Sequence, residues 1–375
     1  MIKPFWLCFA VSFSPIILGQ VRIVDPVAGA YLSGEYEVVL ATPRQADQIA
    51  RTEVYLDGKK IFERYGWASS FTHDFGEAMD RHELYAVVYD VNGQQHSSAV
   101  VITKELRVDL STTARVILMS AVVKTKGNKP ITGLEKDQFR VFENGKPVMI
   151  ETFYNEYVPL DLVFLLDTSS SLRIKGIDVV KSSASVFLKQ LEEGDRVNLF
   201  EFKRQPIQLV GFTTDRKRLV GHIQKLEAIG ETALFDALHA ALSQLKGRRK
   251  GRKAIVLFTD GRDSVYEEPR EKARMMRSGI SKAQNQEVTI YTIGLGRHIH
   301  KEAMARLAEE TGGRFHYADK AGKLPSIFAE IVLDLKHQYI LGITPRSKGS
   351  GFNRMEVKVK KRGAVVYARK GYTRE

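Results

Sequence analysis

Short segments in which apolar and polar residues alternate fill residues 21–105. Glu35–Leu40, Glu53–Leu56 and Leu84–Tyr89 are examples, and the dipeptides Asp57-Gly58 and Asn92-Gly93 separate such segments. A period of two residues is typical of half-buried strands, and Asp-Gly and Asn-Gly are strong hairpin-turn signals. Since no stretch in this region has a 3.6-residue apolar period, we expect residues 21–105 to form an all-β sandwich.

The pattern changes at residue 158, where strongly apolar strands begin to alternate with amphipathic helices. The expected strands are Leu160–Leu166, Arg196–Phe202, Ala254–Phe258, Val288–Ile293 and Arg314–Tyr317, and the expected helices are Ile174–Leu191, Arg216–Leu226, Leu234–Leu245 and Lys301–Glu310. This order predicts a doubly wound (Rossmann-like) α/β domain with a mostly parallel central sheet over residues 158–320.

Two further β regions flank the predicted α/β domain. Residues 106–157 carry strand patterns near Ala114–Val123, Phe139–Glu143 and Val148–Phe153, and residues 321–375 carry a helix near Leu324–Leu335 followed by three more strand patterns. Neither group is large enough to be stable alone. Our hypothesis is that the strands of 321–375 pair with those of 106–157, so that the α/β domain is inserted into one β-sandwich.

Residues 1–20 have the pattern of a secretory signal peptide. Lys3 is followed by a nearly uncharged run from Phe5 to Leu18 that is short for a bilayer span, and Cys8 in this run is the single cysteine of the chain. We therefore expect an exported protein, periplasmic or extracellular, whose mature form has no disulfide. An uncleaved membrane anchor is the alternative reading.

The composition is that of a globular protein with an excess of positive charge. The net charge is +13, which favours acidic partners or an anionic membrane surface. The basic run 246–253 contains no aromatic residue, so nucleic acid is not expected as a partner. We interpret this run as a solvated loop at the amino ends of the strands.

Hydroxyl and carboxylate side chains follow the predicted strands at three places. Asp167, Ser169 and Ser171 come directly after the first strand, and alternate residues of an extended loop point the same way. Thr232 precedes the helix at 234–245, and Asp260 follows the strand at 254–258. Each feature alone could be a helix cap or a turn. Together they form a set of hard oxygen ligands at the carboxyl ends of the strands, which suits Mg²⁺ or Ca²⁺.

In this order, the three loops resemble the metal-ion-dependent adhesion site of von Willebrand factor A domains. The resemblance covers residues 158–320 and implies five metal-site residues: Asp167, Ser169, Ser171, Thr232 and Asp260. It implies Mg²⁺ as the metal, with Ca²⁺ or Mn²⁺ as alternatives, and an open coordination position that accepts a carboxylate of a protein partner. The expected function is thus metal-dependent protein binding, not catalysis.

Two weaker resemblances cover the β regions. Pro26-x-x-Gly29 and the hairpin around Asp57-Gly58 make residues 21–105 similar to bacterial immunoglobulin-like domains. The segment 134–146 and the C-terminal strands resemble the von Willebrand factor A-related proteins of acidobacteria, over most of residues 106–372.

Two other functions compete with adhesion. In a scaffold protein the metal would only fix the loops. The less favoured alternative is a metal-assisted hydrolase, although such sites usually have more carboxylate or histidine ligands. Ser169 or Ser171 could instead be a nucleophile, but there is no Gly-x-Ser-x-Gly motif, and neither His222 nor His239 is expected at a strand end.

Overall fold

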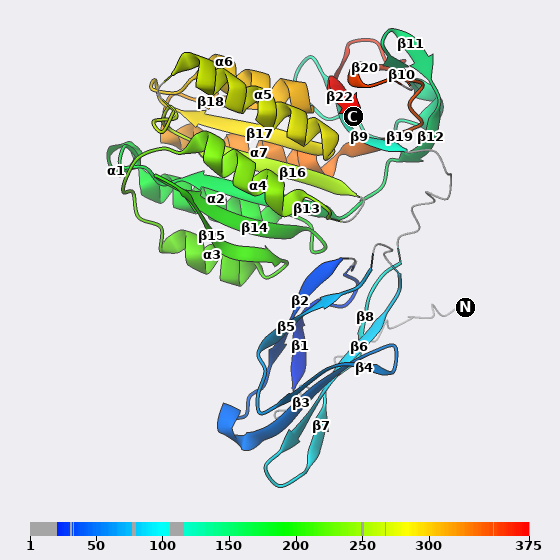
Figure 1. The fold of residues 1–375 in the computed structure, drawn as a ribbon, viewed down its shortest axis with the longest axis vertical. Helices are drawn as coiled ribbons and strands as arrows, with labels where there is room; N and C mark the ends of the chain where they lie inside the picture. Colours follow the sequence, from blue (N-terminus) through cyan, green and yellow to red (C-terminus); the bar gives the residue numbers. More distant parts are fainter. Residues whose placement is uncertain are drawn as a thin grey trace, which may run out of the picture.

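The computed structural model describes residues 21–374, except residues 31, 33, 77–79, 106–115, 249–250, 267 and 348. The predicted signal peptide at 1–20 lies outside the described residues. Figure 1 shows an N-terminal β unit, a central α/β domain and a second β unit built from strands on both sides of that domain in the sequence. Within the described ranges, no helix has both the length and the apolar character needed to cross a bilayer.

The N-terminal β unit has two sheets that share one apolar core. The hairpin predicted at Asp57-Gly58 is confirmed, because both residues have positive φ and the flanking strands pair antiparallel. That the unit is immunoglobulin-like remains a prediction. Its elements are β1 (Arg22–Asp25), β2 (Glu35–Ala41), η1 (Ala46–Gln48), β3 (Ile49–Leu56), β4 (Lys59–Tyr65), β5 (Ser70–Asp74), β6 (Glu83–Asp90), β7 (Gln95–Ser97) and β8 (Val101–Ile102).

The second β unit also has two sheets, with strand orders β11-β10-β20-β22 and β12-β19-β9-β21. Each sheet combines strands from before and after the α/β domain, and the two sheets share one core. The domain boundaries drawn from the sequence stay predictions. The elements are β9 (Ile117–Thr125), η2 (Lys136–Gln138), β10 (Phe139–Glu143), β11 (Lys146–Val148), β12 (Ile150–Tyr154), β19 (Gln338–Ile343), β20 (Gly351–Val359), β21 (Ala364–Ala368) and β22 (Gly371–Arg374).

The α/β domain is the predicted doubly wound fold. Its sheet has the order β15-β14-β13-β16-β17-β18 and is parallel except for the edge strand β15. The strands are β13 (Leu160–Asp167), β14 (Arg196–Phe202), β15 (Pro206–Thr213), β16 (Arg252–Thr259), β17 (Val288–Leu295) and β18 (Phe315–Ala318).

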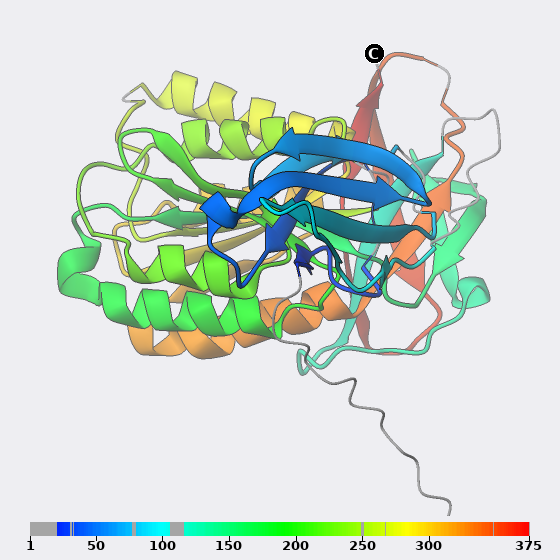
Figure 2. The same cartoon turned by 90° about the horizontal axis from the view of Figure 1, so that it is seen from below.

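Helices cover both faces of this sheet, as Figure 2 shows from below. One apolar core lies under α2, α3 and α7 and the other under α4, α5 and α6. The helices are α1 (Leu172–Lys175), α2 (Ile177–Gln190), α3 (Arg216–Gln224), α4 (Leu234–Leu245), α5 (Pro269–Asn285), α6 (Lys301–Thr311), η3 (Ala321–Lys323) and α7 (Leu324–Lys336).

The helix expected at Ile174–Leu191 is interrupted. Gly176 has φ 103°, which ends α1 and starts α2. The helix α5 and the edge strand β15 were not predicted. Helix α5 begins with Pro269 and has few apolar residues, because only a short stretch near its C-terminus, which includes Ile280 and Ala283, is buried.

The solvated loop predicted for the basic run 246–253 is wrong at Arg248 and again at Arg252 and Lys253, with which strand β16 begins. The Arg252 side chain is buried and donates hydrogen bonds to Gln338 and to the Val158 carbonyl. The Arg248 guanidinium forms an ion pair with Asp161 at 3.3 Å and donates to the Glu35 carbonyl of the N-terminal unit. Packing between units, which the local sequence does not show, takes these charges out of solvent.

The N-terminal unit contacts the α/β domain at the amino ends of its parallel strands. Asp25 is buried and accepts hydrogen bonds from the Thr213 hydroxyl at 2.9 Å, the Thr214 hydroxyl at 2.7 Å and the Tyr36 hydroxyl at 2.5 Å. Burial and the nearby Asp25 charge raise the pKa of Tyr36 well above its usual value. This contact leaves the opposite edge of the sheet, where the candidate site lies, uncovered by the N-terminal unit.

Candidate metal centre

The three loops singled out in the sequence meet at the carboxyl edge of the sheet. The first follows β13 and contains Ser169, the second precedes α4 and contains Thr232, and the third follows β16 and contains Asp260. Strands β13 and β16 are parallel neighbours, and Leu166 pairs with Phe258, so that Asp167 comes level with Thr259. Helix α4 begins beside them at Leu234. The site therefore follows from the strand order, which brings residues almost 100 positions apart in the sequence to one edge.

The first loop directs its hydroxyl groups toward Asp260. The Ser169 hydroxyl lies 3.1 Å from the Ser171 hydroxyl and 3.1 Å from Oδ1 of Asp260. The Asp167 carboxylate accepts the backbone N–H of Ser169 at 2.8 Å, which fixes the turn. Ser170 points elsewhere and donates to the Gly230 carbonyl at 3.2 Å. The alternation expected from the sequence thus separates Ser169 and Ser171 from Ser170.

Thr232 completes the group from the second loop. Its hydroxyl lies 3.5 Å from Oδ2 of Asp167, and Thr232, Asp167 and Asp260 are all buried. A Cβ atom at Gly261 would lie 3.0 Å from the Thr232 hydroxyl, so that the absence of a side chain at residue 261 gives Thr232 room beside the third loop. All five residues proposed from the sequence therefore lie in one cluster.

Burial makes the Asp167 carboxylate hard to ionise in the protein alone. Burial and the nearby negative charge of Asp260 raise the pKa of Asp167 to about 6. The groups that donate to it are uncharged: the Ser169 amide, the Thr232 hydroxyl and the Thr259 hydroxyl, which lies 2.6 Å from Oδ2. Thr259 was not proposed from the sequence, although its position next to Asp260 at a strand end was visible there.

Asp263 and Ser264 brace the site and were also missed. The Asp263 carboxylate accepts the backbone N–H groups of Phe235, Val265 and Tyr266 at 3.0 to 3.1 Å. The Ser264 hydroxyl accepts the Thr232 N–H at 3.0 Å, and the Ser264 N–H donates to the Thr232 carbonyl at 2.9 Å. These hydrogen bonds hold the second loop and the start of α4 against the third loop. Acceptor side chains beside Gly261 were the signal in the sequence.

The donor set fits a hard divalent cation. It offers two carboxylates and three hydroxyls, and a cation between them would favour the ionised form of Asp167, whose pKa is raised by burial and by the Asp260 charge. In the described ranges, this centre included, no group of three or more His, Cys, Asp or Glu side chains is arranged to hold a metal, so a metal here would also need the hydroxyls. The five oxygen-bearing residues are therefore the site to test for metal.

Within the described residues, neither Ser169 nor Ser171 forms a hydrogen bond with a histidine. Ser169 contacts Ser171 and Asp260, and Asp260 is a buried carboxylate. His222 lies on α3, and His239 on α4 contacts the Met275 carbonyl and Lys282. Neither histidine is at the strand edge, as the sequence led us to expect.

The domain is therefore a doubly wound α/β domain with a cluster of buried carboxylates and hydroxyls at the carboxyl edge of its sheet. Residues 161–330 match the family model of the von Willebrand factor type A domain. This part of the chain is therefore a von Willebrand factor type A domain, as the resemblance predicted.

The curated relatives are distant. An uncharacterized protein of Synechocystis sp., sll0103, is 24% identical over 235 residues, which are 58% of this chain and 55% of that protein. Inter alpha-trypsin inhibitor heavy chain 4 of Mus musculus is 23% identical over 214 residues, 50% of this chain and 22% of that protein. The chain thus spans about half or less of these two relatives.

Solved structures with a similar fold include a von Willebrand factor type A protein from Catenulispora acidiphila. It is 14% identical, with a TM-score of 0.43, and the match covers 70% of this chain and 75% of that one. Proximal thread matrix protein 1 from the mussel byssus, with a zinc-occupied MIDAS motif, is 19% identical with a TM-score of 0.42, over 51% of this chain and 48% of that one.

Proposed function

We propose that this chain is a protein-binding module whose α/β domain holds one divalent metal ion and uses it to bind a carboxylate of a protein partner. The observation that carries the proposal is the convergence of Ser169, Ser171 and Asp260 within 3.1 Å contacts beside the buried Asp167. The metal would supply an electrophilic centre. Mg²⁺ is our first choice, with Ca²⁺ and Mn²⁺ as alternatives.

The few charged groups in the set favour an acidic partner. The negative charges of the two carboxylates balance the charge of a divalent ion without exceeding it. An incoming Asp or Glu side chain therefore meets no net negative charge at the site. Two solvent-exposed apolar residues flank the loops of the cluster in the sequence: Ile229 before the second loop is 48% exposed and Val265 after the third loop is 39% exposed. Apolar side chains around a polar centre are typical of protein interfaces.

The first experiment is calorimetric titration of Mg²⁺ and Mn²⁺ into the metal-stripped protein. Asp167→Ala and Ser169→Ala should abolish binding of one ion per chain. Ser170→Ala is the matched control, because its hydroxyl donates to the Gly230 carbonyl and not to the cluster. Absence of binding in the parent chain would mean that the five residues are only caps and turns.

A second experiment separates adhesion from the scaffold alternative. A partner captured from extracellular or envelope extracts in Mg²⁺ should be released by EDTA and should not be captured by Asp167→Ala. A partner that stays bound in EDTA, while calorimetry shows one metal ion, would favour a purely structural metal.

We also propose that the protein is exported, on the basis of the signal-peptide pattern of residues 1–20. Mass spectrometry of the protein purified from its native host should give a chain that begins near residue 20. A chain that begins at Met1 and stays with the membranes would support the anchored alternative.

A further inference from the structure

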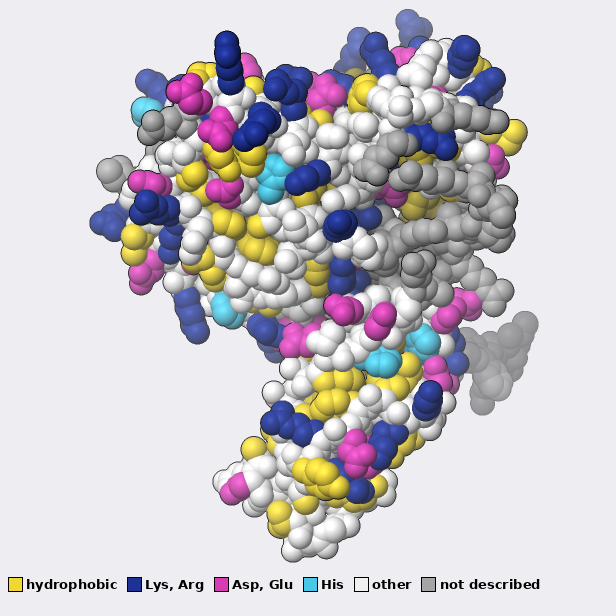
Figure 3. All heavy atoms as spheres, in the orientation of Figure 1, with side chains coloured by type: hydrophobic (Ala, Val, Ile, Leu, Met, Phe, Trp, Pro, Cys, Tyr) yellow, Lys and Arg dark blue, Asp and Glu magenta, His cyan; other side chains and the backbone are white. Residues whose placement is uncertain are grey.

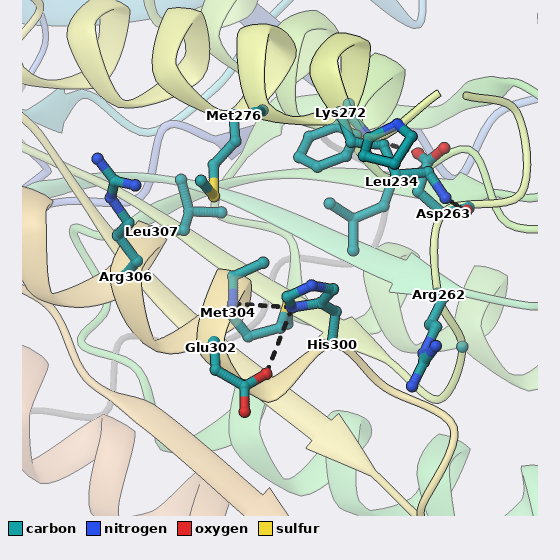
Figure 4. Close-up of a pocket in the computed structure, with 15 residues that line it drawn as sticks. Leu234, Arg262, Asp263, Lys272, Met276, His300, Glu302, Met304, Arg306 and Leu307 are labelled. Carbon is teal, nitrogen blue, oxygen red and sulfur yellow. Dashed lines mark hydrogen bonds and ion pairs between the residues drawn. The ribbon is translucent and has the colours of Figure 1, made fainter. Parts of the chain in front are cut away.

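A cavity of about 460 Å³ lies between the third loop of the metal centre and the helices α4, α5 and α6. Its lining is mainly apolar, with Leu234, Met276, Met304 and Leu307 pointing toward one another in Figure 4. Met304 and Leu307 are buried, and the cavity opens beside charged side chains that reach solvent. A volume of this size accommodates a large aliphatic or aromatic side chain.

The cavity adjoins the candidate metal centre directly. Gly261, which lines it, follows Asp260 in the chain, and a Cβ atom at this position would lie 3.0 Å from the Thr232 hydroxyl. Leu234 and Phe235, which also line it, follow Thr232 by two and three residues. A single short peptide segment can therefore reach both the metal centre and the cavity.

The charges around the cavity favour an acidic occupant. Arg262 and Arg306 are exposed and lie on opposite sides of the apolar lining in Figure 4. Of the two acidic lining residues, Asp263 accepts three backbone N–H groups, and Glu302 is an exposed carboxylate that lies 3.5 Å from Nδ1 of His300. Figure 3 shows basic and apolar side chains side by side over the helices on this face.

We infer that the partner is an acidic segment that carries a large apolar side chain close to its metal-binding carboxylate, and that this side chain fills the cavity. The inference rests on the proposed function, because the carboxylate anchors the segment at the metal. The cavity adds selectivity for the neighbouring residue, and Arg262 and Arg306 attract further negative charge in the segment.

The test uses blocked peptides and the full chain labelled with ¹³C-methyl methionine. Each peptide contains one Asp and one Phe. The Phe stands either before or after the Asp, and it is either adjacent to the Asp or separated from it by one Gly. A matched set of peptides has Gly in place of Phe. Met276 and Met304 report on the cavity, and Met119 in the core of the second β unit is the reference signal. Ala303→Phe fills the cavity, and Ala305→Phe on the same helix, outside the lining, is the matched control.

In Mg²⁺, the best Phe peptide should bind roughly tenfold or more tightly than its Gly counterpart and should shift the Met276 and Met304 signals but not that of Met119. Ala303→Phe should abolish the difference between the peptides, while Ala305→Phe keeps it and both variants bind Mg²⁺ as the parent does.

Four results would overturn the inference. Equal, EDTA-sensitive binding of Phe and Gly peptides would remove the role of the cavity and leave the proposed function intact. A Phe preference that survives in Ala303→Phe would place the side chain elsewhere. Phe-peptide binding that EDTA does not change, or no binding at millimolar concentration, would show that metal and cavity do not share a ligand.

Discussion

Replacing Asp167 by Asn should stabilise the metal-free protein. The ordinary pKa of Asp is 3.8 and that of the buried Asp167 is about 6, a difference that costs about 3 kcal/mol of folding free energy at pH 7.5. Asn removes the buried charge and still accepts the Ser169 amide. The Thr259 hydroxyl, which also lies 3.2 Å from the Gly261 carbonyl, can redirect its hydrogen there. We expect a net gain of about 2 kcal/mol after the weaker hydrogen bonds are counted.

Metal reverses this gain. At a metal concentration a hundred times the Kd, the parent should be stabilised by about 2.7 kcal/mol, whereas Asp167→Asn should gain nothing. The pH dependence has a definite sign. Because the folded pKa of Asp167 is raised, its contribution is most favourable below the unfolded pKa and is lost as pH rises through about 6. The advantage of the variant in EDTA should therefore shrink as pH falls from 7.5 to 4.

Urea unfolding followed by circular dichroism at 222 nm measures this effect, because every α-helix in the described ranges belongs to the α/β domain. Glu231→Gln is the control: it removes an exposed carboxylate beside Thr232 and should change stability little in either condition. If Asp167→Asn were less stable than the parent in EDTA, the idea that the metal-free site holds an unfavourable buried charge would be refuted.

Three further predictions concern the site and its supports. Gly261→Ala should weaken Mg²⁺ binding about tenfold in calorimetry with the fold retained, because its Cβ would lie 3.0 Å from the Thr232 hydroxyl; unchanged affinity would contradict this. Burial next to Arg314 and Lys124 lowers the pKa of His316 to about 3, so this residue should cost about 2 kcal/mol of stability between pH 7 and 5, and His316→Asn should flatten the stability profile measured by urea unfolding. Lys124→Met should destabilise the chain by about 1 to 3 kcal/mol, because Asp334 stays buried and loses one of its cations while it retains Arg314 at 2.9 Å; an unchanged free energy of unfolding in urea would contradict this.

The α/β domain could be predicted from the sequence because each of its central strands is a short run of buried residues bounded by polar turns. Strand β14 and helix α4 have the expected bounds, and the other predicted elements differ by a few residues at their ends. The five site residues could be proposed together because parallel strands place their carboxyl ends at one edge, so that order in the chain translates into proximity.

What could not be predicted depends on contacts between elements. Helix α5 has few apolar residues, and part of its packing is a close approach of backbone to a neighbouring helix: a Cβ at Gly279 would lie 2.6 Å from a Leu238 methyl of α4. The basic run was misread because Asp161 and Gln338, which hold Arg248 and Arg252, are far away in sequence. The pKa of Asp167 likewise depends on burial by three loops.

The insertion of the α/β domain between strands of the second β unit has a mechanical consequence. Strand β12 leads into β13 on one side, and α7 leads into β19 through the single residue His337 on the other. A force applied through a partner bound at the metal centre would be transmitted from the α/β domain to the second β unit through both of these covalent connections. The buried ion pair between Lys124 of β9 and Asp334 of α7 lies beside the second connection and resists its separation. Two connections share the tension in such a chain, whereas a domain attached by a single linker would transmit the whole force through that linker.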